Sequence, residues 1–315
     1  MMRPSRDGKA TKCDRSDDMF AIPDELTMVA LGLAAVDAWW LIRLRRRLEG
    51  TVLLHTWYWG VWLLVVATLA VFAGRWWELS PSVRDSLKWL LLSAGFCPFV
   101  ARLGAKRPQH RAWHWIVLSF WVIAGLPAWQ SIAAGRAFRV GLLWDGLLVL
   151  LLLMQTADCL ATRVWAAPWF LSAGQLLLHP DPRWWKALPD SPALVVMAFL
   201  LGSIGLLALL RGWQPLPRTA LGWTRVWRDF RDRMGVLWSL RLLQRFEQDS
   251  RQDETRVLLR WDGFVEADAS GFRFLEALPE ETERLMRNLL RRFVDHSWIE
   301  AELAATSATA GKVTS

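Results

Sequence analysis

Five polar residues interrupt or flank long apolar stretches and have the clearest potential for chemistry. They are Asp37, His55, His114, Gln155 and Asp158. Ionisable groups are costly inside a bilayer, so each is a candidate functional group. If the first two apolar runs are antiparallel helices, Asp37 and His55 lie about 7.5 Å and about 5 Å from the same face. His114 begins a later run, and Gln155 and Asp158 end another, so the sequence predicts one polar cluster just inside this face.

A carboxylate near an imidazole at this depth suits a proton relay, or an anion site shared with nearby arginines. The alternative is that each side chain reaches the interface and is only solvated there. Ala30, Ala34 and Ala38 recur at four-residue spacing beside Asp37, which is typical of closely packed transmembrane helices and predicts that Asp37 faces inward. Asp145 belongs to the opposite leaflet and is expected to stand alone.

No metal or cofactor site is predicted. His110 and His114 have a spacing at which two imidazoles share a metal, but no third ligand accompanies them and Pro108 precedes them. His55 and His114 are the one pair placed for axial haem ligation, and both are shallow. The three cysteines form no CxxC pair, and the chain lacks a P-loop, a GxSxG elbow and an HExxH motif. The lack of these motifs therefore favours a protein that is not an enzyme.

Seven apolar runs must position these residues. They cover residues 26–42, 52–73, 89–103, 113–134, 140–160, 164–178 and 192–210. A helix that crosses the hydrocarbon core needs about 20 apolar residues. The run at 164–178 would reach only about 23 Å as a helix, so a six-span scheme competes with the seven-span one. The sequence predicts an all-α, polytopic integral membrane protein, a bundle of about seven (six to seven) transmembrane helices at 26–210 after a polar tail at 1–25.

Two short basic loops orient this bundle. Their basic residues are Arg43, Arg45, Arg46, Arg47, Arg102, Lys106, Arg107 and Arg111. Alternating crossings put both loops on one face, and an excess of positive charge marks the cytoplasmic face. We therefore expect a multi-pass protein of a bacterial plasma (inner) membrane, with a cytoplasmic C-terminus and these residues bound to anionic lipid headgroups.

The charged region at 211–305 is expected to be small, cytoplasmic and mainly helical. An apolar stripe from Trp223 to Leu237 recurs at three- and four-residue steps and predicts an amphipathic helix. On its other faces lie further predicted headgroup-binding residues, Arg225, Arg228 and Arg231. A short hairpin with a turn at Asp262-Gly263 and a second helix from Pro279 follow. Residues 306–315 are expected to form a disordered tail.

Tryptophan numbers 23 against a single tyrosine, and the indoles gather at the ends of the apolar runs. Amphipathic indoles favour the headgroup boundary, where the ring is in apolar surroundings and the N–H is hydrogen-bonded. The tryptophans of this tryptophan-rich chain are therefore predicted to mark the two edges of the bilayer.

The first functional hypothesis is a non-catalytic scaffold or accessory protein that docks a protein partner through its cytoplasmic helices. The alternative is a secondary transporter or proton-coupled permease that uses the Asp37–His55 region, although transporter sites usually lie nearer the midplane. A third is a membrane enzyme that acts on lipid phosphates. Net charge is +8, but the basic residues adjoin the membrane and no recognition motif accompanies them, so no nucleic-acid partner is expected.

Overall fold

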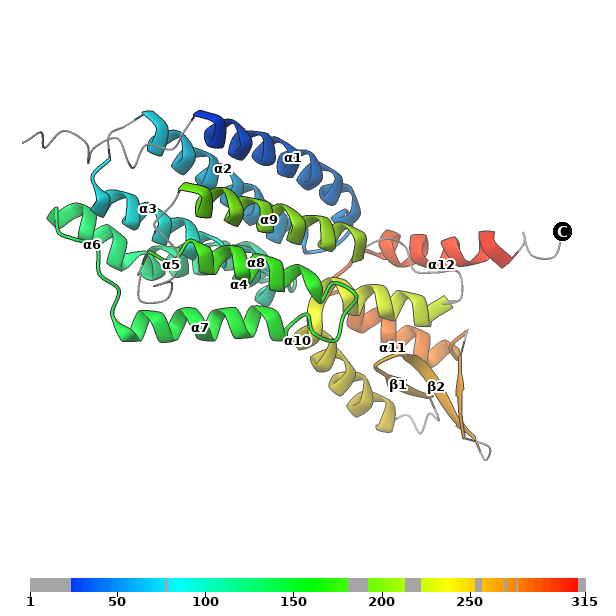
Figure 1. The fold of residues 1–315 in the computed structure, drawn as a ribbon. Coiled ribbons are helices and arrows are strands. Elements are labelled where there is room, and N and C mark those ends of the chain that lie inside the picture. Colours follow the sequence, from blue (N-terminus) through cyan, green and yellow to red (C-terminus); the bar gives the residue numbers. More distant parts are fainter. Residues whose placement is uncertain are drawn as a thin grey trace, which may run out of the picture.

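Helices make up nearly all of the structure, as the sequence predicts. The computed structural model describes residues 24–76, 79–180, 192–212, 222–252, 257–268, 271–275 and 277–310. A bundle of helices forms the larger part, and residues 222–310 form a smaller C-terminal module at one end of it (Figure 1). The tail predicted at 1–25 lies outside the described residues, except for Asp24 and Glu25, which begin the first helix.

Four helical stretches in the described residues are long and apolar enough to cross a membrane. They are α1 (Asp24–Leu48), α2 (Leu54–Trp76), the pair α3 (Pro81–Ala94) and α4 (Cys97–Leu103), and α9 (Pro192–Gly212). Large apolar side chains on their outer faces are exposed, among them Met28, Ile42 and Leu69. Such a surface is unfavourable in water and suits contact with lipid. The length and the exposed apolar surface of these helices therefore support the prediction of a membrane protein.

The broken helix α3–α4 lies at the centre of the bundle. Ser80 begins it by accepting a hydrogen bond from the Val83 N–H at 3.4 Å, with Pro81 in the first turn. The helix is interrupted at Gly95 and Phe96, and Pro98 lies in the first turn of α4. All six side chains from 89 to 94 are buried, so this stretch packs against protein on every side.

The run predicted as a single span at 113–134 is instead two helices, α5 (His110–Ala124) and α6 (Leu126–Ala134), which meet at 52°. Pro127 follows the break and has no backbone N–H to continue the α5 hydrogen-bond ladder. A Cβ at Gly125 would lie 2.8 Å from Leu90 Cδ2, so the bend also packs closely against α3. If this bent pair is one span, five stretches are long enough to cross.

Helices α7 (Leu142–Ala157) and α8 (Ala166–Leu177) are shorter, with 16 and 12 residues. At 1.5 Å per residue they reach about 24 Å and about 18 Å. The predicted count of seven spans is therefore not confirmed, and four or five is what length and composition support. Helix α8 packs closely on α9, because a Cβ at Gly174 would lie 2.9 Å from the Ala198 carbonyl oxygen and one at Gly205 would lie 3.1 Å from that of Ala167.

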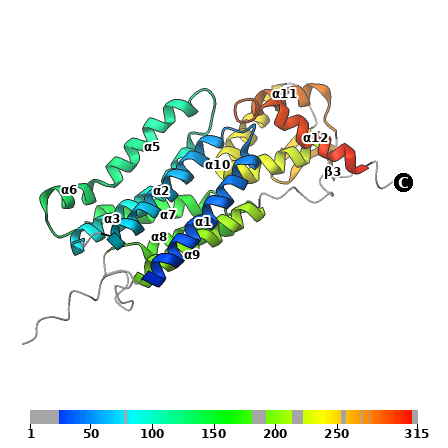
Figure 2. The same cartoon turned by 90° about the horizontal axis from the view of Figure 1, so that it is seen from above.

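Successive helices run in opposite directions, so their connections gather at two ends of the bundle (Figures 1 and 2). The loops at 49–53, 104–109 and 158–165 lie at the end that carries the C-terminal module, because each of them hydrogen-bonds to it. Helix α6 and the beginning of α1 lie at the other end, which we call the distal end.

The C-terminal module begins with α10 (Gly222–Gln252), the predicted amphipathic helix, which is broken at Gly235. A three-stranded antiparallel sheet follows, with β1 (Val257–Arg260), β2 (Gly263–Asp268) and β3 (Gly271–Phe274) in that order. Helices α11 (Glu280–Leu290) and α12 (His296–Ala310) complete the module. The disordered tail expected at 306–315 is wrong for residues 306–310, which belong to α12, and the rest of that segment lies outside the described residues.

The predicted hairpin is present, but its turn is displaced by one residue. Arg260 pairs with Gly263, so Trp261 and Asp262 form the turn, whereas Asp262-Gly263 was the predicted turn. The sequence did not predict the third strand. Strand β3 pairs with β2, with Phe274 opposite Val265, and extends the hairpin to a three-stranded sheet.

One apolar core joins the module to the bundle. Its largest fully buried members in the module are Trp227, Phe230, Phe246 and Phe264, and Leu48 and Leu53 of the bundle belong to the same core. Several indoles also tie separate segments together by donating to backbone carbonyls. These bonds run from Trp57 to Leu41, from Trp89 to Ala124, from Trp113 to Val100 and from Trp238 to Arg102, at 2.7–3.0 Å. These tryptophans are thus structural ties between helices.

Candidate functional site

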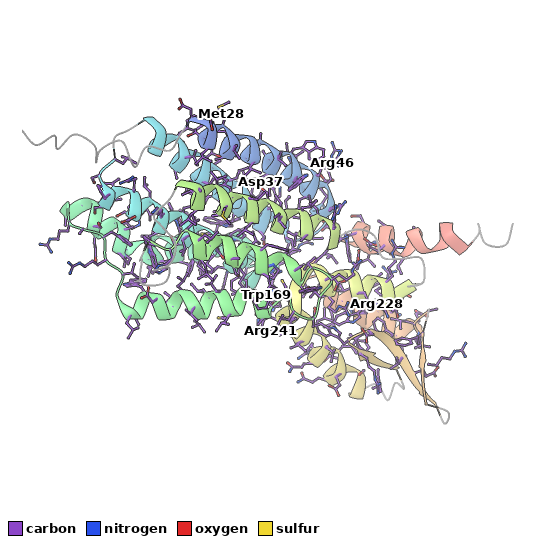
Figure 3. The ribbon with its side chains drawn as sticks, viewed as in Figure 1. Met28, Asp37, Arg46, Trp169, Arg228 and Arg241 are labelled. Atoms are coloured by element: carbon purple, nitrogen blue, oxygen red, sulfur yellow. The ribbon has the colours of Figure 1, made fainter. Side chains whose placement is uncertain are left out.

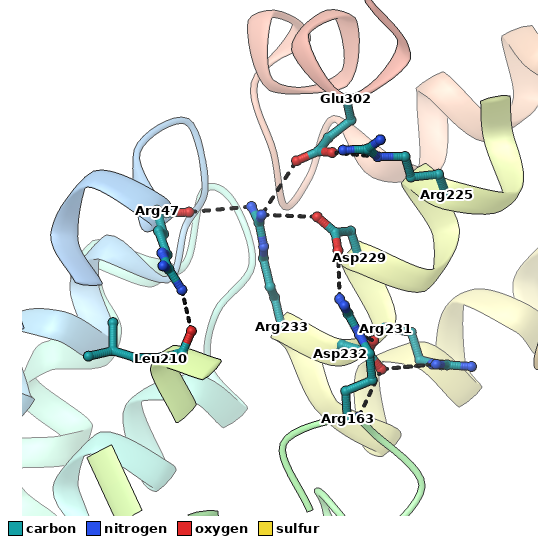
Figure 4. Close-up of polar contacts among 9 residues, drawn as sticks. All are labelled: Arg47, Arg163, Leu210, Arg225, Asp229, Arg231, Asp232, Arg233 and Glu302. Carbon is teal, nitrogen blue, oxygen red and sulfur yellow. Dashed lines mark hydrogen bonds and ion pairs between the residues drawn. The ribbon is translucent and has the colours of Figure 1, made fainter. Parts of the chain in front are cut away.

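A network of buried ion pairs lies where the module meets the bundle (Figure 4). We call it the junction network, and its members are Arg163, Arg225, Asp229, Arg231, Asp232, Arg233 and Glu302. It brings four guanidinium groups together with three carboxylates. The side chains of Asp229 and Asp232 are only 3% and 0% exposed, so their charges depend on these partners rather than on water.

Arg163 connects the bundle to α10. It belongs to the loop between α7 and α8, and its Nη2 atom donates to Asp229 Oδ1 at 2.8 Å. Its Nε also donates to Asp232 Oδ2, one turn further along α10. The two aspartates are three residues apart and therefore share a helix face, so one guanidinium reaches both. Arg231 supports this arrangement by donating to Asp232 Oδ1 at 3.0–3.1 Å and to the Trp261 carbonyl at 2.9 Å.

Arg233 extends the network to α12. Its guanidinium lies 3.0 Å from Asp229 Oδ2 and 3.4 Å from Glu302 Oε1, and it donates to the Arg47 carbonyl at 3.3 Å. Arg225 lies 3.4 Å from the other oxygen of Glu302. Arg47 in turn donates to the Leu210 carbonyl at the end of α9. The network therefore touches α1, α9, α10, α12 and the α7–α8 loop.

The carboxyl of Glu302 has a pKa above its usual value. Burial raises this pKa, and the nearby carboxylate of Asp229 raises it further, while Arg233 and Arg225 oppose the change. Glu302 thus occupies a site where burial and a like charge outweigh two cationic neighbours.

A second contact lies where α10 breaks. Gly235 has φ +84° and ψ 178°, which lies in a backbone region largely reserved for glycine, and the break points the next N–H groups at Asp158. Val236 donates to the Asp158 carbonyl at 2.8 Å, and Leu237 donates to Oδ1 at 2.9 Å. Arg102 pairs with Oδ2 of the same aspartate. The end of α7 is thereby fixed to the middle of α10.

A third contact holds the linker between α11 and α12. Arg107 pairs with Asp295 at 2.7 Å, and its N–H donates to the Arg292 carbonyl at 2.9 Å. From the α1–α2 loop, Val52 donates to the Phe293 carbonyl at 2.9 Å, and Asp295 donates back to the Gly50 carbonyl at 2.7 Å. Three loops of the bundle therefore grip the module at separate points.

The five residues predicted to form one polar cluster have four separate sets of partners. His55 and His114 do meet, with Nδ1 of His55 2.9 Å from Nε2 of His114. The Trp59 indole donates to His114 Nδ1 at 2.9 Å. Because an indole nitrogen only donates, that ring nitrogen accepts, and His114 must donate from Nε2 to His55. Trp59 therefore donates to His114 and His114 donates to His55, so the two hydrogen bonds run in the same direction.

The other three residues lie elsewhere. Asp158 belongs to the contact with α10 described above. Gln155 contacts Ser172 and Gln175 of α8 at 3.4 and 3.2 Å, in a buried polar cluster between α7 and α8. Asp37 is buried beside Ser203 of α9.

The expectation that Asp145 stands alone is wrong. Its Oδ1 lies 3.2 Å from Nε2 of His179, whose side chain is completely buried beneath the Trp89 ring near the distal end. His179 lies just after the short helix α8. Its pairing with Asp145 was not predicted, because the two residues are 34 positions apart and no local pattern links them.

Some of the predicted headgroup-binding residues are exposed, and the others make contacts within the protein. Arg43, Arg45, Arg46 and Arg111 are exposed near the module end of the bundle, and Lys106 is half-buried there. Arg47, Arg102 and Arg107 are engaged in the contacts above. Arg225 and Arg231 are buried in the junction network, a placement that differs from the predicted surface position because α10 packs within the module. Arg228 donates to the Asp262 carbonyl at 2.8 Å.

In the described residues no group of three or more His, Cys, Asp or Glu side chains is arranged to hold a metal ion. The side chain of His110 lies outside the description, so the predicted His110–His114 spacing is untested. Comparison with protein-family models, with curated proteins and with solved structures finds no match to this chain.

Proposed function

We propose that the protein is a membrane-embedded scaffold that holds its C-terminal module rigidly against one face of the membrane. The observation that carries this proposal is the junction network, in which Arg163 of the bundle pairs with the buried carboxylates of Asp229 and Asp232 in the module. Removing one partner from a buried ion pair is strongly unfavourable, so the network resists separation of the two parts. A firm attachment of this kind suits a platform that presents a surface in a fixed orientation.

We further propose that the chain crosses a bacterial plasma membrane seven times, with the module in the cytoplasm. In support, the basic loops that contain Arg43–Arg47 and Arg102–Arg111 lie at the module end. Helix α8 starts at the module end and packs antiparallel to α9, so its direction is that of a crossing helix. Its short length is compatible with a crossing because it packs on α9 rather than lying alone in lipid.

Anionic lipid headgroups are the partner proposed for the membrane-facing edge of the module. Immediately after the α10 break, Leu237 and Leu240 are exposed on one helix side, and the guanidinium of Arg241 lies 5.0 Å from the Trp238 ring centre. Exposed Trp169 on the neighbouring α8 supplies further amphipathic surface (Figure 3). An apolar stripe beside a cation suits the headgroup boundary.

The face proposed to dock a protein partner is the outer side of the sheet. Leu258 and Phe274 are exposed there, and Arg260 lies two residues from Leu258 on the same face of β1. An apolar patch bordered by arginine fits a partner segment that is apolar and acidic, since arginine and aromatic residues are enriched in interfaces.

Photocrosslinking in the full-length, membrane-embedded protein tests this function. A photoreactive amino acid is placed at Leu258 or Phe274, and as a control at Arg136, which is exposed at the distal end. We expect one discrete protein adduct from both sheet positions and its absence from Arg136. Crosslinks only to lipid from all three positions, or the same adduct from both ends of the molecule, would contradict a scaffold that works through the module.

A proton-coupled permease is the second candidate, and one observation favours it. Asp37 is buried near the middle of α1 rather than close to a membrane face, because α1 continues to Leu48. A midplane carboxyl is more typical of a transport site than the shallow cluster that the sequence predicted. Proton uptake by proteoliposomes that contain the protein, and its loss in Asp37→Asn, would support this candidate over the scaffold.

A further inference from the structure

Asp37 lies near the middle of α1, the longest described helix of the bundle. It follows Asp24 by 13 residues and precedes Leu48 by 11, which places it about 16–20 Å from either end of α1. In Figure 3 it lies between Met28 and Arg46, near the two ends of that helix. Only 9% of the residue is exposed, so it faces protein rather than lipid.

The carboxyl group lacks the partners that a buried charge requires. It lies within hydrogen-bonding range of Ser203, near the middle of α9, but neither Asp37 Oδ1 nor Ser203 Oγ is in a well-formed hydrogen bond in the described part of the chain. Buried polar atoms in proteins are almost always hydrogen-bonded, so two such atoms side by side call for an explanation. The Ser203 hydroxyl can donate to a carboxylate or accept from a carboxylic acid, and with no cation nearby the acid form avoids burying a charge.

The helices packed against α1 offer no compensating charge at this depth. These helices are α2 and α9. On α9 the one ionisable residue is Arg211, in the last turn. On α2 the ionisable residues are His55 and Tyr58 near the module end and Arg75 near the other end. None of them lies near the middle of its helix.

Asp37 also has no counter-charge on its own helix. The acidic residues Asp24 and Glu25 occupy the first turn of α1. The nearest basic residue, Arg43, is six positions away and exposed, with its guanidinium 3.7 Å from the Trp39 ring centre. An isolated carboxylate in such surroundings is strongly disfavoured relative to the neutral acid.

We propose that Asp37 and Ser203 form a proton-binding site between α1 and α9, in which the Asp37 carboxyl binds and releases a proton. The bound proton lies on one carboxyl oxygen and is donated to the Ser203 hydroxyl oxygen. The ligand of the site is therefore a proton. This assignment does not depend on the scaffold function, and it concerns a part of the bundle remote from the module.

Labelling with dicyclohexylcarbodiimide tests the site in the full-length protein in membranes. This apolar reagent reacts with protonated carboxyls: the acid proton moves to one nitrogen while the carboxyl oxygen bonds to the central carbon, and an oxygen-to-nitrogen acyl shift then leaves a stable N-acylurea. We expect one adduct per chain at pH 7, mapped to Asp37 by mass spectrometry, and progressive loss of labelling as the pH is raised. A water-soluble carbodiimide should leave Asp37 unmodified.

Mapping the adduct in the unmodified sequence avoids dependence on a variant that fails to fold. Asp37→Asn should lose the adduct, whereas Asp145→Asn, which removes the other membrane-buried carboxyl paired with His179, should retain it. Ser203→Ala should move the pH at which labelling is lost to a higher value, because the carboxylate loses a hydrogen-bond donor that favours the ionised form. No adduct at Asp37, or protection by sodium chloride but not by choline chloride at fixed pH, would overturn the proposal; the second result would indicate a metal-cation site.

Discussion

Arg163 and Asp229 are 66 residues apart in the sequence, yet Nη2 of the arginine lies 2.8 Å from Oδ1 of the aspartate. The first residue belongs to a loop of the bundle and the second to the C-terminal module, so this pair joins the two parts directly. The second carboxylate oxygen of Asp229 lies 3.0 Å from Arg233. A single buried carboxylate therefore bridges two guanidinium groups, and its loss would leave both without that partner.

Asp229→Asn should destabilise the protein. The substitution keeps the side-chain volume but removes the negative charge, and we expect a loss of about 3 kcal/mol because one partner of a buried pair is removed while Arg163 remains partly solvated. Thermal unfolding of the full-length protein in nanodiscs measures this. Asp249→Asn is the matched control, since its pair with Arg245 is on the surface and should contribute less than about 1 kcal/mol. Equal effects from the two substitutions would contradict a structural role for the network.

Gly235→Ala should weaken the attachment of α10 to the end of α7. The backbone there has φ +84°, and the new Cβ would lie 2.5 Å from Asp158 Oδ2, so we expect a cost of about 1–3 kcal/mol for the backbone alone. Protease sensitivity of the module and thermal unfolding both report this. Gly146→Ala on α7 is the control, because a Cβ there meets nothing within 4 Å and the substitution should cause no loss.

Stability should depend on pH through Glu302. Its pKa in the folded protein lies above its usual value of 4.5, so its contribution to stability is fully present below pH 4.5 and is lost as the pH rises through the folded-state pKa. Wild type should therefore lose stability relative to Glu302→Gln as the pH rises from 4.5 toward neutral. In an Asp229→Asn background the difference should shrink, because the like charge that raises the pKa is absent. A wild type that gains on the variant over this range would contradict the assignment.

Most helical segments could be predicted from local composition, whereas the division of 113–134 into α5 and α6 and of the helix expected from Pro279 into α11 and α12 was not predicted. Their ends were less accessible: α1 continues to Leu48 through a run of arginines that the hydropathy pattern treats as a boundary, and this moves Asp37 from a shallow position to the middle of the helix. The bend at Gly125 was readable in principle, since Pro127 follows it.

The site was much harder to predict, because every important contact joins distant parts of the chain. Arg163, Asp229 and Glu302 join one network only once α10, α12 and the α7–α8 loop have packed, and no local pattern encodes that packing. The aspartates of α10 alternate with arginines, and that alternation was the available signal. It was interpreted as an interruption of a basic surface, whereas in the fold it is a set of buried pairs.

The number of crossings leads to a prediction that tests whether α8 crosses the membrane, as the seven-span arrangement requires. With Cys13 replaced by serine and the buried Cys97 and Cys159 retained, single cysteines are placed at Arg136, at Gln109 and at Ala187. Intact cells are then treated with a membrane-impermeant maleimide before and after permeabilisation. Arg136→Cys lies at the distal end and should be labelled in intact cells, whereas Gln109→Cys lies at the module end and should be labelled only afterwards.

Ala187→Cys, between α8 and α9, decides the case. If α8 crosses the membrane, this position should behave like Arg136→Cys, because α8 runs away from the module and α9 must return to it. Labelling of Ala187→Cys only after permeabilisation would mean that α8 turns back within the membrane and would refute the seven-span arrangement. Because α9 ends at Gly212 beside the module, that result would also place the distal end of α9 on the same side of the membrane as the module. A 21-residue apolar helix that spans about 32 Å cannot satisfy this requirement and still cross.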